Sequence, residues 1–240
     1  KANIIIFPEN FISTSGKKKE IFIDSDKKFL KFFQGMAKKY KIDVVPGSVI
    51  ERNWFGKKYN VSYYIDSYGK VLCRHKKVHL WLSEKSLLKP GKETKVFDTK
   101  YGKVGLIICW DLMFSEVFKK IMKENASIIF CPSNWSYQDA GKGLKYDKNS
   151  EIKLVDSLCV ERAFGNEVIL VFCNTAGGSY DKSKKVYSMG HSQVTEPFKG
   201  VVKKLDSSKE QMFIVNVNTK ILDDAEKSYE LKKDFKIKKK

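Results

Sequence analysis

The chain has 240 residues, 42% of them hydrophobic, which is enough apolar material for the core of a globular domain and excludes a small disulfide-stapled protein. The 46 Lys and Arg residues exceed the 28 Asp and Glu residues, so the formal net charge is +18. Because most of this excess is lysine spread along the whole chain, we expect a solvated surface and no specific nucleic-acid partner.

Short β-branched runs and helical periodicities alternate along the chain, as in an α/β fold. Residues 3–7 read as a buried strand that ends at Pro8. A helix is predicted from Asp26 to Tyr40, with lysines on its outer face. The remaining predicted elements are strands at 43–45, 61–66 and 70–74, a strand at 104–109, a helix at 114–124, a strand at 127–131, a helix at 150–164, and strands at 168–173, 191–195 and 213–217.

The end of the chain has a different composition from the rest. Residues 227–240 contain seven lysines against Glu230 and Asp234, a net charge of +5. The sequence therefore predicts one domain over residues 1–226, followed by a basic, solvated C-terminal tail over residues 227–240.

The cysteines and histidines do not form a metal-binding pattern. The five cysteines are odd in number and widely spaced, no pair has CxxC spacing, and the three histidines do not complete a ligand set. Free thiols indicate a reducing compartment, and the apolar runs are shorter than the ~20 residues of a membrane helix. We therefore expect a soluble, cytoplasmic protein with no metal, no cofactor and no membrane partner.

Cys109 lies at a predicted strand-to-helix corner, a place where a nucleophile can be exposed. The thiolate is the attacking species, so a catalytic cysteine needs a base, and no histidine is an obvious partner. Taken alone, this segment would indicate a buried and inert cysteine.

Three segments together change this interpretation. Phe7-Pro8-Glu9, residues 75–80 (HKKVHL) and residues 108–116 (ICWDLMFSE) occur in the order and spacing of the nitrilase superfamily of carbon–nitrogen hydrolases, which the chain resembles. Ser115 stands where proline is usual in that family. The family's first strand and helix, which precede the Pro-Glu strand, are absent from this sequence, and we expect that an N-terminal piece is lacking.

The resemblance implies a four-layer α-β-β-α sandwich and a Glu-Lys-Cys triad. In this sequence the triad residues are Glu9 as general base, Lys77 and the nucleophile Cys109. The motif register favours Lys77 over its neighbour Lys76.

The family's second glutamate corresponds to Glu84, with Glu93 as an alternative. Trp110, Ser133, Asn134 and Trp135 resemble pocket-lining positions. The resemblance further implies a homodimer, or a higher homo-oligomer, formed through the helices after Cys109 and over residues 150–164.

The implied reaction is hydrolysis of a small linear amide or an N-carbamoyl compound through a Cys thioester. Asp111 after Cys-Trp is typical of amidase branches of the family, whereas nitrilases usually carry glutamate there. The alternatives are a nitrile hydrolase, a glutaminase-like supplier of ammonia and, from a different class, a basic nucleic-acid-binding protein.

Overall fold

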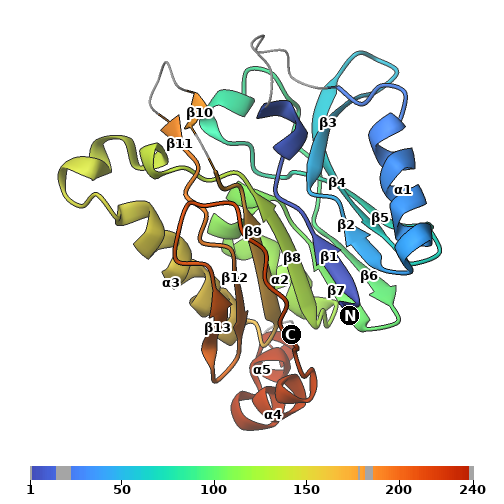
Figure 1. The fold of residues 1–240 in the computed structure, drawn as a ribbon. Coiled ribbons are helices and arrows are strands. Elements are labelled where there is room, and N and C mark those ends of the chain that lie inside the picture. The colour runs from blue at the N-terminus through green and yellow to red at the C-terminus, as the bar shows by residue number, and fades with distance from the viewer. Residues whose placement is uncertain (1, 15–22, 178, 182–185, 238–240) are drawn as a thin grey trace.

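The computed structural model describes residues 2–14, 23–177, 179–181 and 186–237. Two β-sheets pack face to face, and helices cover their outer faces (Figure 1). The predicted four-layer α-β-β-α sandwich is confirmed: α1 lies outside the first sheet, and α2 and α3 lie outside the second.

The first sheet is formed by the N-terminal part of the chain. Its order is β1-β2-β4-β3, and β5 pairs with the other edge of β4. β1 and β2 are parallel, and the remaining pairs are antiparallel. The strands are β1 (Ile4–Ile6), β2 (Asp43–Val45), β3 (Ser48–Arg52), β4 (Lys58–Ile65) and β5 (Val71–Lys76).

The second sheet has six strands in the order β13-β12-β9-β8-β7-β6. Its three central strands β7, β8 and β9 are parallel, so their carboxyl ends lie along one edge of the sheet. The strands are β6 (Lys95–Thr99), β7 (Gly102–Leu106), β8 (Ile128–Ser133), β9 (Ile169–Asn174), β12 (Gln193–Glu196) and β13 (Gly200–Lys204); β10 (Ser179–Asp181) and β11 (Val186–Tyr187) form a separate small hairpin.

Each outer helix buries one apolar stripe against its sheet. α1 (Lys28–Tyr40) buries Phe29, Phe33 and Ala37, and its first turn is capped by the Asp24 carboxylate, which accepts hydrogen bonds from two backbone N–H groups. The helix begins two residues after Asp26, where it was predicted to start, and Asp26 does not cap it. The other outer helices are α2 (Ser115–Lys123) and α3 (Ser150–Gly165).

The sheets meet through a continuous apolar layer. Val45 and Tyr64 of the first sheet pack with Leu106, Phe130 and Ile169 of the second. This layer fixes the two sheets relative to each other and so sets the distance between residues at their adjoining ends.

Five strands were missed by the sequence analysis, namely β3, β6, β10, β11 and β13, and one predicted strand was wrong. β3, β6 and β13 are each five residues long and carry charged residues that resemble loop residues, although Ser48–Glu51 of β3 are buried. Residues 213–217 form neither a strand nor a helix. Phe213 and Val215 nevertheless pack on the core between the sheets, which explains the apolar alternation that suggested a strand.

The C-terminal segment is helical where the composition predicts a solvated tail. α4 (Lys220–Tyr229) and α5 (Leu231–Ile237) follow each other, and α5 contacts α2. Lys232 lies 3.7 Å from the carboxylate of Glu167, a fully buried residue in the turn between α3 and β9, and 3.6 Å from that of Glu226. The backbone N–H of Leu231 also donates to Glu167. These contacts attach the last helices to the second sheet's layer.

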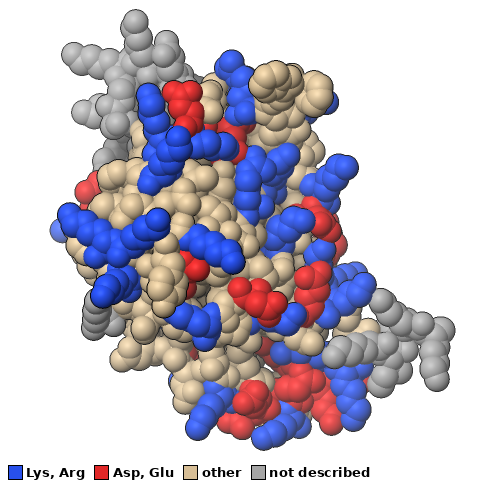
Figure 2. Space-filling model, turned by 90° about the vertical axis from the view of Figure 1, so that its right-hand side faces the viewer, with Lys and Arg blue, Asp and Glu red and all other residues tan. Residues whose placement is uncertain are grey.

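The excess positive charge is spread over the molecular surface. Figure 2 shows Lys and Arg side chains distributed over the face that α1 covers, with acidic side chains between them. Within the described residues, no helix combines the length and the apolar character that a membrane crossing requires.

Candidate active site

Cys109 lies three residues after the end of strand β7, at the start of a 3₁₀ turn over Cys109–Met113. Its backbone φ is 47°, in the left-handed region that residues other than glycine rarely adopt. Such local strain is concentrated at functional sites and persists only where the surroundings enforce it. The corner turns the thiol toward the adjoining ends of both sheets, and the residue remains 7% exposed.

Glu9 comes from the first sheet, three residues after β1 ends. Its backbone N–H donates to the carbonyl of Ser133, at the end of β8 in the other sheet, over 3.2 Å. Its buried carboxylate accepts hydrogen bonds from Asn60 Nδ2 at 2.7 Å and from Lys77 Nζ at 2.9 Å. The Cys109 thiol lies near enough to lower the pKa of this carboxyl against the effect of burial. Glu9 therefore joins the ends of the two sheets beside the nucleophile.

Lys77, and not Lys76, lies inside the site. Its ammonium is 2.9 Å from Glu9 and 2.8 Å from Glu84, and the residue is 2% exposed. The Lys76 ammonium instead lies over the ring of Tyr59, 3.7 Å from the centroid. Successive side chains along an extended strand point to opposite faces, and this holds for Lys76 at the end of β5 and Lys77 after it. A shift of one residue in the strand pairing would therefore exchange the positions of the two lysines.

The backbone around Lys77 is held by a close approach. Gly91 N–H donates to the Lys77 carbonyl at 2.7 Å, and a Cβ on Gly91 would lie 2.3 Å from the Lys76 carbonyl oxygen. Only glycine fits at this point, which accounts for the Pro90-Gly91 pair in the sequence.

Glu84 completes the charged cluster from the loop after β5. Its carboxylate contacts the Lys77 ammonium, accepts the backbone N–H of Trp81 at 2.8 Å and accepts Asn60 Nδ2 at 3.0 Å. Glu93, the alternative considered from sequence, pairs with Lys95 and Lys120 at the surface. The structure thus brings Glu84 to Lys77 and leaves Glu93 outside the site.

Burial and charge set the protonation of the cluster. Lys77 lies against two carboxylates, which raise the pKa of its ammonium well above the ordinary value despite burial. Burial raises the pKa of the Glu9 carboxyl. Burial and then the Glu9 charge raise the pKa of the Cys109 thiol. The site therefore holds a fixed cation, a carboxyl of increased proton affinity and a thiol that keeps its proton until a base removes it.

Asp111 ties the nucleophile corner to the segment that follows Lys77. Its fully buried carboxylate accepts the backbone N–H of Ile108 at 3.0 Å and those of Val78 and His79 at 3.2 and 2.7 Å. Hydrogen bonds from His75 and His79 lower the pKa of this carboxyl against the opposing effect of burial. Asp111 therefore positions Cys109 relative to Lys77 without reaching the reacting atoms.

We expect Asp111→Asn to lower both stability and turnover. The amide matches the carboxylate in size but replaces an acceptor oxygen with a donor, so a buried N–H is left unpaired at a cost of about 1–3 kcal/mol. Urea unfolding and steady-state kinetics should show a lower free energy of unfolding and a larger effect on kcat than on KM. Asp98→Asn, on an exposed carboxylate of β6, is the matched control. An unchanged kcat in Asp111→Asn would refute the positioning role.

The four residues predicted to bind substrate have different surroundings. Trp110 packs edge-to-face against Trp81, with ring centroids 4.4 Å apart, and its ring is tilted against that of Trp135 at 5.5 Å. The backbone N–H of Asn134 lies near the Cys109 sulfur and lowers the pKa of the thiol against the effect of burial. Trp135 is buried and donates its indole N–H to the Glu151 carboxylate. The buried Ser133 hydroxyl donates a hydrogen bond to the Cys131 carbonyl. Trp110 and the Asn134 backbone thus lie next to the thiol, whereas the Ser133 and Trp135 side chains already have internal partners.

Two residues that support the site were given no such role by the sequence analysis. Asn60 bridges Glu9 and Glu84 through one amide nitrogen, and Asp111 holds the nucleophile corner. The available signal was a polar residue at a buried phase of a strand, for Asn60, and an acid two residues after the cysteine, for Asp111. Neither pattern states which distant group the side chain meets.

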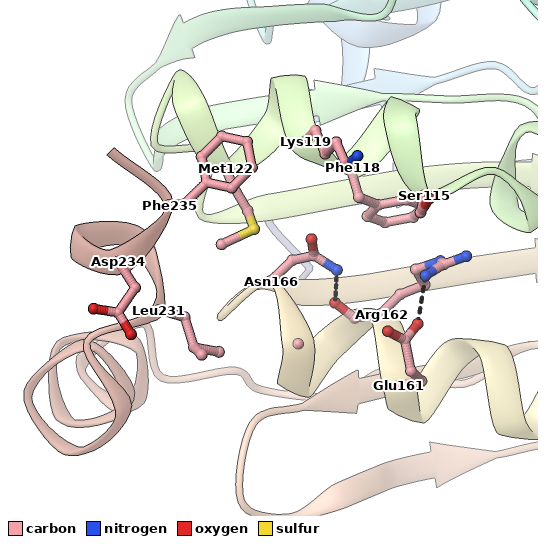
Figure 3. Close-up of a pocket in the computed structure, with 11 residues that line it drawn as sticks. Ser115, Phe118, Lys119, Met122, Glu161, Arg162, Asn166, Leu231, Asp234 and Phe235 are labelled. Atoms are coloured by element: carbon pink, nitrogen blue, oxygen red, sulfur yellow. Dashed lines mark hydrogen bonds and ion pairs between the residues drawn. The ribbon is translucent and has the colours of Figure 1, made fainter. Parts of the chain in front are cut away.

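A separate pocket of about 410 Å³ lies between α2, α3 and α5, away from Cys109 (Figure 3). Figure 3 shows Arg162 of α3, and Asn166 directly after α3, facing Phe118 and Met122 of α2, with Phe235 of α5 at the end away from Ser115. Among the described residues, no group of three or more His, Cys, Asp or Glu side chains is arranged to hold a metal ion.

Comparisons with known proteins agree with this arrangement. The family model for carbon–nitrogen hydrolases matches residues 1–226. A probable nitrilase from Schizosaccharomyces pombe is 30% identical over 93% of this chain and 77% of its own length. An omega-amidase from Saccharomyces cerevisiae is 29% identical over 70% of this chain and 56% of its own length.

The fold comparison gives the same result. The crystal structure of Saccharomyces cerevisiae Nit3, a member of branch 10 of the nitrilase superfamily, superposes with a TM-score of 0.79 at 25% identity. The match covers 95% of this chain and 81% of that structure.

Proposed function

Since this chain belongs to the carbon–nitrogen hydrolase family, we propose that its Glu9–Lys77–Cys109 cluster hydrolyses a small linear amide or an N-carbamoyl compound. Family membership makes the chain an amidase-type hydrolase; the triad and the substrate class are the proposal. The observation that carries it is the buried convergence of the Cys109 thiol, the Glu9 carboxylate and a lysine held by two carboxylates.

The first half of the reaction forms a thioester. Glu9 takes the thiol proton as Cys109 Sγ bonds to the carbonyl carbon, and the carbonyl electron pair moves to oxygen. Lys77 and the backbone N–H of Trp110 stabilise this oxyanion, a role worth about 3–4 kcal/mol per donor. The tetrahedral intermediate then collapses, the C–N bond breaks, and Glu9 returns its proton to the departing ammonia or amine.

The second half regenerates the thiol. Glu9 removes a proton from water as the water oxygen attacks the thioester carbon. The C–S bond breaks, the sulfur takes back the proton, and the carboxylic acid or carbamic acid leaves. Glu84 keeps Lys77 protonated and directed toward the oxyanion throughout, as its 2.8 Å contact with the ammonium suits it to do.

The relatives favour amides among the possible substrates. One relative bears the name omega-amidase, which supports an amide, and another is named a probable nitrilase, which makes a nitrile the alternative to test. Asp111 after Cys-Trp, typical of amidase branches, adds to the case for amides.

Release of ammonia from a panel of small linear amides, N-carbamoyl amines and nitriles tests the proposal. We expect turnover of amides or carbamoyl amines, together with an acyl adduct on Cys109 when the reaction is quenched in acid and analysed by mass spectrometry. Turnover of nitriles alone would contradict the substrate class. An adduct on a different cysteine would contradict the triad.

A further inference from the structure

The hairpin between β3 and β4 holds two aromatic side chains in solvent. Trp54 is 98% exposed and Phe55 is 83% exposed. The turn that carries them is ordered by hydrogen bonds from Asn53 N–H to the Lys57 carbonyl, from Gly56 N–H to the Asn53 carbonyl and from Lys57 N–H to the Asn53 side chain. An ordered turn that presents two adjacent large apolar groups to water indicates an interaction surface.

A second segment with exposed apolar groups lies beside this hairpin. The loop after β5 exposes Leu82 and Leu87 at 69% and 54%. It is attached to the hairpin because Lys89 N–H donates to the Lys58 carbonyl at 2.8 Å, and because the buried Leu88 packs on Ile50 of β3. Trp54, Phe55, Leu82 and Leu87 thus belong to one structural unit, which we call the apolar rim.

Basic residues predominate in the two segments that carry the apolar rim. Arg52, Lys57, Lys58, Lys85, Lys89 and Lys92 flank it, and none of them forms an ion pair with another described residue. The two acids of these segments do not offset this charge at the surface. Glu51 is buried against Arg74 and Lys27, and Glu84 is engaged by Lys77.

We propose that the apolar rim docks the protein on an anionic lipid surface. Trp, Phe and Leu are the side chains that enter the boundary between headgroups and acyl chains, and lysines beside them are attracted by anionic headgroups. The composition of the whole chain predicts no membrane partner, but it averages over the surface and does not register this local grouping.

Other occupants of the apolar rim fit less well. Two copies of the chain joined rim to rim would bring a dozen unpaired cations together without acids between them. Single-stranded nucleic acid is bound by aromatic rings spaced to stack successive bases, whereas this surface pairs its aromatics with exposed leucines, which have no such role.

Co-sedimentation with vesicles tests the proposal on the full chain. Vesicles of phosphatidylcholine with phosphatidylserine should bind the protein, and vesicles of phosphatidylcholine alone should bind it much more weakly. We expect Trp54→Ala/Phe55→Ala to weaken the binding to anionic vesicles by about 10-fold or more. Tyr68→Ala, which removes an 80% exposed aromatic from the turn between β4 and β5, should leave it unchanged.

Charge reversal separates the local effect from net charge. Lys57→Glu/Lys89→Glu should weaken the binding about 25-fold or more, from about 5-fold per lysine removed. Lys220→Glu/Lys227→Glu makes the same change in net charge on α4 and should have a much smaller effect. Trp54→Ala/Phe55→Ala is called the tip variant below. Its amide turnover in solution should equal that of wild type, which would show that the fold is intact.

Three results would overturn the proposal. Equal vesicle binding by wild type and the tip variant would show that general charge suffices. Loss of self-association in the tip variant, by light scattering, with vesicle binding unchanged would assign the rim to a second copy. Tighter binding of single-stranded RNA than of anionic vesicles, lost in the tip variant, would assign it to nucleic acid.

Discussion

Replacement of Cys109 by alanine is expected to reduce kcat by about 10⁴-fold or more while the protein remains folded. The thiol supplies the only atom that bonds to the substrate in the proposed mechanism, and removal of a catalytic nucleophile has effects of this size or larger. Alanine at this position has the same left-handed backbone as cysteine and adds no new strain. The measurement is ammonia release under saturating amide, with circular dichroism to verify the fold.

Cys173→Ala is the matched control for this substitution. Burial raises the pKa of the Cys173 thiol to about 12, and the described structure places no carboxylate base on that sulfur. Its removal should leave turnover within a few-fold of wild type. Retained activity in Cys109→Ala, or inactivation by Cys173→Ala alone, would refute the assignment of the nucleophile.

Substitution of Lys77 by methionine should damage both catalysis and stability. Loss of one oxyanion donor costs about 10²–10³-fold in kcat. Removing the cation also leaves Glu9 and Glu84 facing each other in the interior, and breaking a buried ion pair by removing one partner costs about 3–5 kcal/mol of unfolding free energy. Urea unfolding monitored alongside kcat separates the two effects.

Lys76→Met provides a neighbour of identical chemistry for comparison. Its side chain lies over Tyr59 and makes no contact with Glu9 or Glu84. We expect turnover close to wild type and a small change in stability. If Lys76→Met abolished activity and Lys77→Met did not, the assignment of Lys77 to the active site would be refuted.

The central chemistry of the site could be predicted because it lies in short local motifs. Pro8-Glu9, the HKKVHL segment and the ICWD segment each end a strand, and strand ends that share an edge bring their residues together. Local sequence could place each of these residues on an element. It required the resemblance to a family to select Lys77 over Lys76 and Glu84 over Glu93.

The support for those residues could not be predicted in the same way. Asn60 lies opposite Ile50 in a β-ladder, and its role depends on two carboxylates that are 51 and 24 residues away in the sequence. Trp135 was predicted to line the pocket from its position, but its indole N–H found an internal acceptor in Glu151. Such pairings are tertiary, and no periodicity encodes the partner.

The edge strands could not be predicted from the sequence for a related reason. β6 (Lys95–Thr99) and β13 (Gly200–Lys204) each have one face toward solvent and contain lysines that resemble loop residues. Edge strands carry such charges because these discourage pairing with other chains. The composition that protects the edge is therefore the composition that hides the strand.

The attachment of α5 places a lysine of the C-terminal segment next to a buried acid of the second sheet's layer. Within the described residues, Lys232 is the cation that lies near both Glu167 and Glu226. Burial and the nearby Glu226 carboxylate raise the pKa of the Glu167 carboxyl. A cut after residue 226 would remove Lys232 and leave a fully buried carboxylate without its cation in the turn that leads into β9.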